Sequence, residues 1–170
     1  MQRTSLKSIV RLLSPVVFVI VALIIFTNFV DYPELIPPET SYTNFPVTLT
    51  SATGIKITFD VELADTQYER SVGLMYRDKL EESSGMLFIL PSDTKSSFWM
   101  KNVEFPLDII FINSESEIVS ISPNSQPCVT EVCEQYSSEY PYRYVLEVNG
   151  GLIERYKIGV GDLVELPALP

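Results

Sequence analysis

The stretch "SFWMKNVEFPLDIIFI", residues 97–112, places polar side chains that could do chemistry inside an apolar sequence. Lys101, Asn102 and Asp108 all stand within it. An isolated buried carboxylate is costly, so Asp108 needs either a partner or a position at the rim of the fold. Two interpretations are open: Asp108 ties down residues 102–106 by accepting backbone N–H bonds or forming an ion pair, or it lines a cleft.

The cleft hypothesis groups Trp99, Lys101, Asn102 and Asp108, with Arg77 as a cation that the fold could bring close. A lysine beside a carboxylate in a cleft could act as a general acid or base, with Arg77 positioning an anionic group. No nucleophile accompanies the pair, which favours binding over catalysis. Strand alternation does not decide whether Trp99 is a core residue or an exposed platform for a ligand.

The chain has two cysteines, Cys128 and Cys133, and no histidine. The favoured interpretation is a disulfide that closes a short loop. A redox-active pair and a metal site completed by Glu131 and Glu134 are the alternatives. The C-x4-C spacing disfavours a redox-active pair, and the absence of histidine disfavours a metal site. We therefore expect no metal and no cofactor.

These residues must be positioned by strands, because short apolar runs dominate the sequence after residue 50. In residues 55–63, "IKITFDVEL", apolar and polar side chains alternate, which predicts a half-buried strand. Thr66 with Glu69 has the spacing of a capping box, which predicts a short helix that ends near Met75. Further strands are predicted at residues 85–90, 97–101, 107–112, 117–121, 144–148 and 163–166, with a hairpin turn at 113–116 and one or two helical turns after the glycines at 150–151.

This pattern predicts a compact, mainly β fold, an antiparallel β-sandwich or barrel with one or two short helices. The strand at 107–112 is apolar on both faces, so we expect it to lie at the centre of the sheet.

The first 46 residues lack the pattern of short strands and contain a long uncharged run and a proline-rich segment. Residues 12–30 carry no charge and are long enough for a transmembrane anchor, which we favour over a cleaved signal peptide. Three basic residues precede this run, so residues 1–11 are expected to form a cytoplasmic tail. Residues 31–46 contain four prolines and are interpreted as a stalk, which leaves 47–170 as an extracytoplasmic β domain.

The charge of the chain beyond residue 30 excludes some partners. That part holds nine basic and 22 acidic residues, a formal charge of −13. Such a surface repels nucleic acid and anionic lipid headgroups, and it suits cationic ligands or simple solubility.

Three blocks, "ERSVGLMYRDKLEESSGMLFIL", "SFWMKNVEFPLDIIFI" and "YRYVLEVNGGLIERYKIGVGDLVEL", resemble the domain of unknown function 192 family over about residues 48–166. The resemblance implies a compact β fold with one short helix, and its cysteine loop is similar to that of exported members, in which the two cysteines could be bridged. Val103 departs from the family pattern, which usually has threonine there. The resemblance directs attention to Gly73, Met75, Arg77, Gly85, Met86, Trp99, Met100, Lys101, Asn102, Pro106 and Asp108.

No established activity accompanies this family. We therefore expect a membrane-anchored, extracytoplasmic binding or accessory module at the cell envelope, whose partner is an envelope protein or a small-molecule ligand and not nucleic acid. An envelope enzyme using the Lys101 and Asp108 pair is the alternative, and a purely structural envelope protein is a further one.

Overall fold

The computed structural model describes residues 44–168. The predicted cytoplasmic tail, anchor and most of the proline-rich segment lie outside these residues. Within the described part, no helix is long and apolar enough to cross a membrane.

Seven strands form one sheet in the order β5-β4-β6-β3-β2-β1-β7. All neighbouring pairs are antiparallel except β2 and β3, which are parallel. The helix α2 and residues 73–83 make the crossover that this parallel pair requires. The elements are β1 (Phe45–Thr50), β2 (Lys56–Ala64), α2 (Gln67–Val72), β3 (Ser84–Thr94), β4 (Leu107–Ile112), β5 (Ile118–Ser125), β6 (Tyr142–Asn149), α3 (Leu152–Tyr156) and β7 (Leu163–Glu165).

The sheet curls into a half-barrel, and its two edge strands touch only at the start of β5, where an isolated bridge joins Glu117 to Leu163. Ile118, at the start of β5, donates its N–H to the Asp162 carbonyl at 2.9 Å, and Val164 of β7 donates to the Ser116 carbonyl at 2.9 Å. The predicted mainly β fold with two short helices is confirmed in this form.

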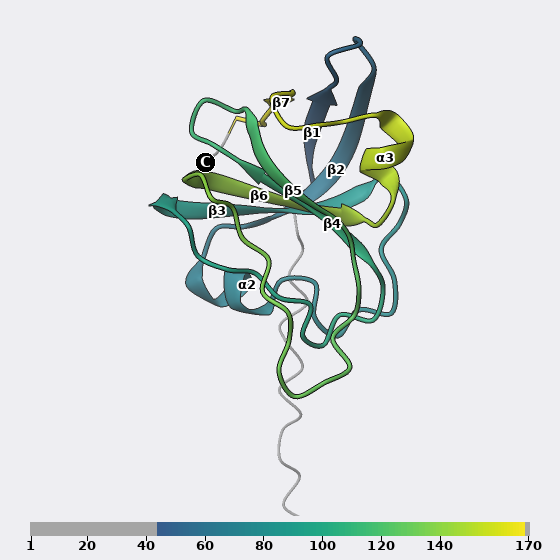
Figure 1. Ribbon diagram of the computed structural model, residues 1–170, viewed down its shortest axis with the longest axis vertical. Coiled ribbons are helices and arrows are strands. Elements are labelled where there is room, and N and C mark those ends of the chain that lie inside the picture. Colours follow the sequence, from purple (N-terminus) through teal and green to yellow (C-terminus); the bar gives the residue numbers. More distant parts are fainter. Residues whose placement is uncertain (1–43, 169–170) are drawn as a thin grey trace, which may run out of the picture. The chain divides into compact units, whose positions relative to one another are not determined.

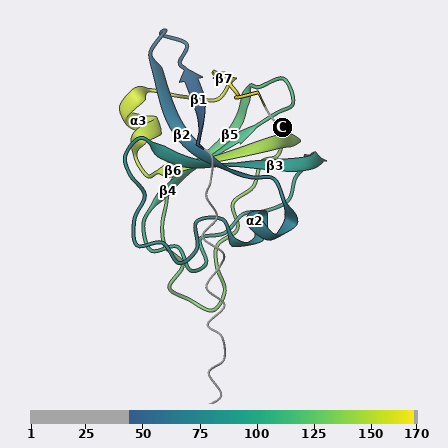
Figure 2. The same ribbon diagram turned by 180° about the vertical axis from the view of Figure 1, so that it is seen from behind.

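All seven strands contribute apolar side chains to the inner face of the curl. Phe59, Leu87, Ile110 and Leu146 are among the fully buried members of this inner core. Helix α3 follows the turn at residues 150–151 and lies against β1 and β2 on this side in both views (Figures 1 and 2). Its Leu152 and Ile153 pack into the same core.

The outer face of the central strands carries a second core, because alternate residues of β4 point away from the first. Leu107, Ile109 and Phe111 belong to this outer core, with Phe88 and Tyr142. Helix α2 and the long loops at residues 95–106 and 126–141 lie on this side of the sheet (Figure 1). Strand β4 is therefore buried along its whole length, as the sequence predicted.

Helix α2 forms the predicted capping box at Thr66. The Glu69 N–H donates to the Thr66 hydroxyl at 3.2 Å, and the Glu69 carboxylate accepts from the Thr66 N–H at 2.9 Å. The helix ends at Val72, three residues before the predicted Met75, because the residue that follows, Gly73, has a φ of 51° that ends the helical conformation.

Two strand predictions were wrong. Residues 97–101 form no strand; only isolated bridges join Phe98 to Tyr136 and Lys101 to Cys128, so this segment is a loop over the outer core. Strand β1 was missed because it begins at Phe45 and contains Pro46. Proline is tolerated there since β7 pairs only with Thr48–Thr50, beyond Pro46.

Candidate functional site

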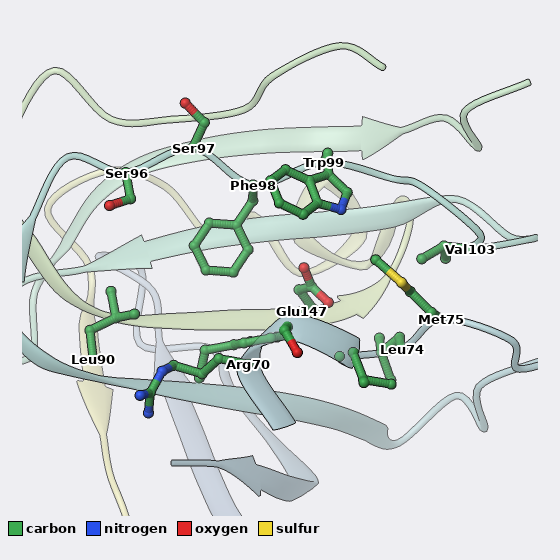
Figure 3. A pocket seen from close by; sticks show the side chains of 14 residues that line it. Arg70, Leu74, Met75, Leu90, Ser96, Ser97, Phe98, Trp99, Val103 and Glu147 are labelled. Atoms are coloured by element: carbon green, nitrogen blue, oxygen red, sulfur yellow. The ribbon is translucent and has the colours of Figure 1, made fainter. Parts of the chain in front are cut away.

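A hollow opens on the outer face of the sheet, between α2 and the loop at residues 95–106. Its volume is about 200 Å³. Figure 3 shows the lining side chains, which are mostly apolar or aromatic. We call it the Glu147 pocket; its lining residues are Arg70, Ser71, Val72, Gly73, Leu74, Met75, Phe88, Leu90, Ser96, Ser97, Phe98, Trp99, Val103 and Glu147.

Hydrogen bonds hold in place the two walls of the pocket, the segment that follows α2 and the loop at residues 95–106. On one wall, Tyr76 donates its N–H to the Asn102 carbonyl at 2.8 Å, and the Asn102 side-chain amide donates to the Tyr76 hydroxyl at 2.8 Å. On the other, Phe98 and Tyr136 exchange backbone bonds of 2.7 and 2.9 Å. The segment after α2 and the 95–106 loop are thus joined to each other beside the pocket.

Glu147 lies at the base of the pocket. It stands on β6 with Met86 of β3 and Ile109 of β4 as its direct neighbours across the sheet. The residue is 5% exposed, and no hydrogen bond or ion pair joins its carboxyl group to another described residue. No fully enclosed side-chain oxygen among the described residues lacks a partner, so the carboxyl oxygens keep some contact with the pocket opening. Burial raises the pKa of Glu147 to about 8, because an apolar environment disfavours the charged form.

Gly85 lets β3 and β6 approach closely beneath the pocket. A Cβ atom at this position would lie 2.8 Å from the backbone carbonyl oxygen of Glu147. Any side chain at residue 85 would therefore displace the strand that carries Glu147. The glycine that the family resemblance singled out is explained by this contact.

Arg70 is the other charged residue of the lining, and it does not neutralise Glu147. Its Nη1 atom donates to the Ile89 carbonyl at 2.9 Å and also to the Asp65 carbonyl. In Figure 3 the guanidinium group lies beside Leu90, away from the Glu147 carboxyl group.

Asp108 has a structural role. It is fully buried on the inner side of the sheet, and its carboxylate accepts N–H bonds from Asn124 at 2.7 Å, Gly151 at 3.0 Å and Ile153 at 2.9 Å. Asp108 accepts backbone N–H bonds, as the first of the two sequence interpretations expected, but the amides belong to β5 and the start of α3, so Asp108 does not tie down residues 102–106. Asp108 is no part of an open cleft.

The other residues of the predicted cleft are dispersed. Trp99 is 45% exposed and lines the Glu147 pocket. Arg77 donates two hydrogen bonds of 2.6 Å to the carboxylate of Glu62. Lys101 is exposed on the outer loop, whereas Asp108 faces the inner side, so the structure does not join them as an acid–base pair.

The remaining motif residues pack around these features. Met86 and Met100 are buried in the outer core, and Met75 lines the pocket. Gly73 lies against the ring of Phe88, where an added Cβ would be 3.0 Å away. The Pro106 carbonyl accepts the Gly150 N–H at 2.9 Å, which closes the turn before α3.

Cys128 and Cys133 form the predicted disulfide, with Cα atoms 5.5 Å apart. The structure therefore confirms the loop closure. Within residues 44–168, no group of three or more histidine, cysteine, aspartate or glutamate side chains is arranged to hold a metal ion.

Glu147 was not found from the sequence. The signal was present, since "YVLEV" holds a single charged residue among apolar ones. That pattern also fits an exposed strand face, and only the packing of α2 and residues 95–106 over the outer face shows that Glu147 is buried.

Comparison with known proteins places the chain among relatives that share this fold. It is 29% identical over 114 residues to the UPF0127 protein PF1050 of Pyrococcus furiosus, covering 66% of this chain and 90% of the relative. A crystal structure of a protein of unknown function from Novosphingobium aromaticivorans matches with 37% identity and a TM-score of 0.69 over 75% of this chain and 89% of that one. A structure from Sinorhizobium meliloti, provisionally named a transcription regulator, matches with 38% identity and a TM-score of 0.70 over 75% and 97%. The profile of the DUF192 family (Uncharacterized ACR) matches residues 48–166, and the chain belongs to this family.

Proposed function

We propose that this domain is a binding module that holds a small, mainly apolar ligand in the Glu147 pocket. The observation that carries the proposal is a carboxyl group, 5% exposed and without a protein partner in the described chain, at the base of an apolar hollow. No fully enclosed side-chain oxygen or nitrogen among residues 44–168 lacks a hydrogen-bond partner, so the unpaired oxygens of Glu147 must be reachable from the pocket. A ligand in the pocket can therefore contact the carboxyl group, and ionisable groups with shifted pKa values in clefts commonly mark binding sites.

The size of the pocket indicates the size of the ligand. An apolar cavity of about 150 Å³ holds benzene, so about 200 Å³ accepts a substituted ring or a short branched chain. A nucleotide or a sugar chain is too large to enter the pocket whole. Nucleic acid is also disfavoured as a partner by the acidic surface, since residues 44–168 hold nine basic and 19 acidic residues.

Binding is tested by titrating the ¹⁵N-labelled full chain with benzyl alcohol and, separately, with benzylamine. At least one probe should shift the amides of residues 72–75, 97–99 and 147 in a saturable manner. Leu90→Trp, which adds volume to the pocket wall, should abolish these shifts. Val160→Trp alters an exposed residue that does not line the pocket and should leave them unchanged. Shifts that never saturate, or that spread over the whole surface with both probes, would refute the proposal.

We further propose that the module acts outside the cytoplasm, held by residues 12–30 as a membrane anchor. The uncharged run at 12–30 supports this location, and so does the Cys128–Cys133 disulfide, because disulfides persist in oxidising compartments. The test is to treat membranes with alkaline carbonate and intact cells with an added protease. The anchored chain should stay with the membrane and lose its domain to the protease; a chain released by carbonate or protected from the protease contradicts the location.

A further inference from the structure

We propose that the ligand of the Glu147 pocket is an organic cation, a protonated amine or guanidinium group on a small apolar body. This inference rests on the proposed binding function and names the chemical class of its ligand. Figure 3 shows the carboxyl group of Glu147 between Phe98 and Trp99 on one side and Leu74 and Met75 on the other, which is where the charged end of such a ligand would lie.

The carboxyl group lacks a counter-ion that the surrounding elements could have supplied. Arg70 on α2 is held by two backbone carbonyls. The direct neighbours on β3 and β4, Met86 and Ile109, are apolar. A cation delivered by the ligand would be the first to pair with Glu147.

The next charged and titratable groups around Glu147 are already paired. On the same face of the sheet, one strand beyond Met86, Glu62 is bound by Arg77 at 2.6 Å. On β6 itself, the Tyr142 hydroxyl donates to the Ser96 carbonyl, and burial raises the pKa of Tyr142 to about 12. With its pKa raised to about 12, Tyr142 stays neutral near pH 7, and Glu62 is held by Arg77, so Glu147 is the group that responds to a ligand in the pocket.

Aromatic rings line the pocket: Phe98 and Trp99 come from the 95–106 loop, and Phe88 comes from β3. Phe88 and Phe98 meet edge to face with their centroids 5.2 Å apart, and Trp99 is half exposed at the opening. Aromatic faces attract cations, and tryptophan does so most strongly. An alkylammonium group is therefore favoured twice, by the rings along its path and by the carboxyl group at the base. The same two features disfavour an anionic ligand, because the aromatic faces and an ionised carboxylate both repel negative charge.

The excess of negative charge on the domain also favours a cationic ligand. Among residues 44–168, 19 acidic residues outnumber nine basic ones. Four of the nine, Arg77, Lys79, Arg143 and Arg155, are engaged in ion pairs with carboxylates. A surface of this sign raises the local concentration of cations and lowers that of anions.

Binding of a cation is coupled to the loss of a proton. Because burial raises the pKa of Glu147 to about 8, the free pocket holds a neutral carboxylic acid at pH 7. When R–NH₃⁺ enters, the O–H bond of Glu147 breaks, the proton passes to solvent, and the carboxylate pairs with the ammonium group. One proton is released for each cation bound, so the affinity rises with pH, by up to about tenfold per unit, until the free carboxyl group is itself ionised.

The test compares two probes of nearly equal shape, benzylamine and benzyl alcohol, on the purified full chain by isothermal titration calorimetry. Measurements at pH 6, 7 and 8.5, each in two buffers of different ionisation enthalpy, give both the affinity and the number of protons released. We expect benzylamine to bind at least about tenfold more tightly than benzyl alcohol at pH 8.5, to weaken steeply below pH 8, and to release close to one proton at pH 6 and 7. Benzyl alcohol should release none.

The variant Glu147→Gln should abolish both the advantage of benzylamine and its proton release, while benzyl alcohol still binds. Glu131→Gln removes an exposed carboxylate from the disulfide loop and should change neither. If both probes bind equally, or the alcohol binds more tightly without proton release, the ligand is neutral and this inference fails although the binding function stands. If neither probe binds the wild-type chain, the binding function itself fails, and this inference fails with it.

Discussion

The buried carboxyl group of Glu147 should make the stability of this domain depend on pH in an unusual direction. The informative perturbation is Glu147→Gln, which keeps the shape of the side chain and removes its ability to ionise. Most carboxylates in folded proteins have lowered pKa values and stabilise the fold as the pH rises. The pKa of Glu147 is raised instead, because the folded state favours its protonated form, so Glu147 destabilises the fold as the pH rises.

The magnitude follows from the difference between the two states. The pKa of Glu147 is about 8 in the folded protein against an ordinary value of 4.5, so between these values the folded state binds more protons than the unfolded chain. The stabilisation that comes from the protonated carboxyl group then decreases as the pH rises through this window, and this contribution, not the fold itself, is fully lost above pH 8. At 1.36 kcal/mol per unit, the glutamate costs the fold up to about 5 kcal/mol at pH 9 and nothing at pH 4. The glutamine carries no such cost.

Urea denaturation of the full chain, followed by circular dichroism at pH 4, 6 and 9, measures the effect. The free energy of unfolding of the Gln variant should match that of the wild type at pH 4 to within about 1 kcal/mol and exceed it by about 3–5 kcal/mol at pH 9. Glu131→Gln controls for the removal of one negative charge from an acidic domain. A difference that does not change with pH would show that folding leaves the pKa of Glu147 unshifted, and a variant less stable than wild type at pH 9 would show that the folded protein holds Glu147 ionised and partnered; either result contradicts the environment described above.

Four further perturbations test the remaining structural assignments by the same denaturation assay. Asp108→Asn should cost about 2–4 kcal/mol, because it replaces a carboxylate that accepts three backbone N–H bonds; a loss below 1 kcal/mol would contradict that role. Gly85→Ala should cost about 1–3 kcal/mol, because the added Cβ meets the Glu147 carbonyl, and it should also perturb probe binding. Replacing both Cys128 and Cys133 by serine should cost about 2 kcal/mol, since the closed loop is short. Thr66→Ala removes the cap of α2 and should cost about 1 kcal/mol.

Much of the sheet could be predicted because its strands obey local rules. The period-two alternation of residues 55–63 located β2, and the apolar run at 107–112 located β4 and its burial on both faces, although β4 lies next to the edge strand β5 and not at the centre of the sheet. The capping box located α2, and the two cysteines located the disulfide. In each of these cases the physical cause acts between residues that are near in sequence, so the sequence alone carries the signal.

The candidate site could not be predicted in the same way, because it depends on which distant segments cover the outer face. Residues 97–101 have the composition of a strand, yet they cross above the sheet and are fixed by single bridges to Tyr136 and Cys128. Their position turns Phe98 and Trp99 into a pocket wall. Asp108 is a charged residue in an apolar run, so the sequence shows that it needs a partner. The amides that bind it come from β5 and from the turn that leads into α3, and the sequence does not show that these segments lie beside it.

Asp108 and Glu147 are buried carboxyl groups on neighbouring strands, and they have opposite effects on the stability of the fold. Asp108 pairs with Val148 in the register of β4 and β6, and Ile109 pairs with Glu147, so the two acids occupy adjacent rows and opposite faces of the sheet. Asp108 meets three N–H groups and stabilises the turn into α3, whereas Glu147 meets apolar side chains and opposes folding whenever it ionises. Glutamine or leucine at residue 147 would give a more stable domain at neutral and alkaline pH. The presence of a glutamate there is consequently not explained by stability, and the ligand contact proposed above would give it a reason.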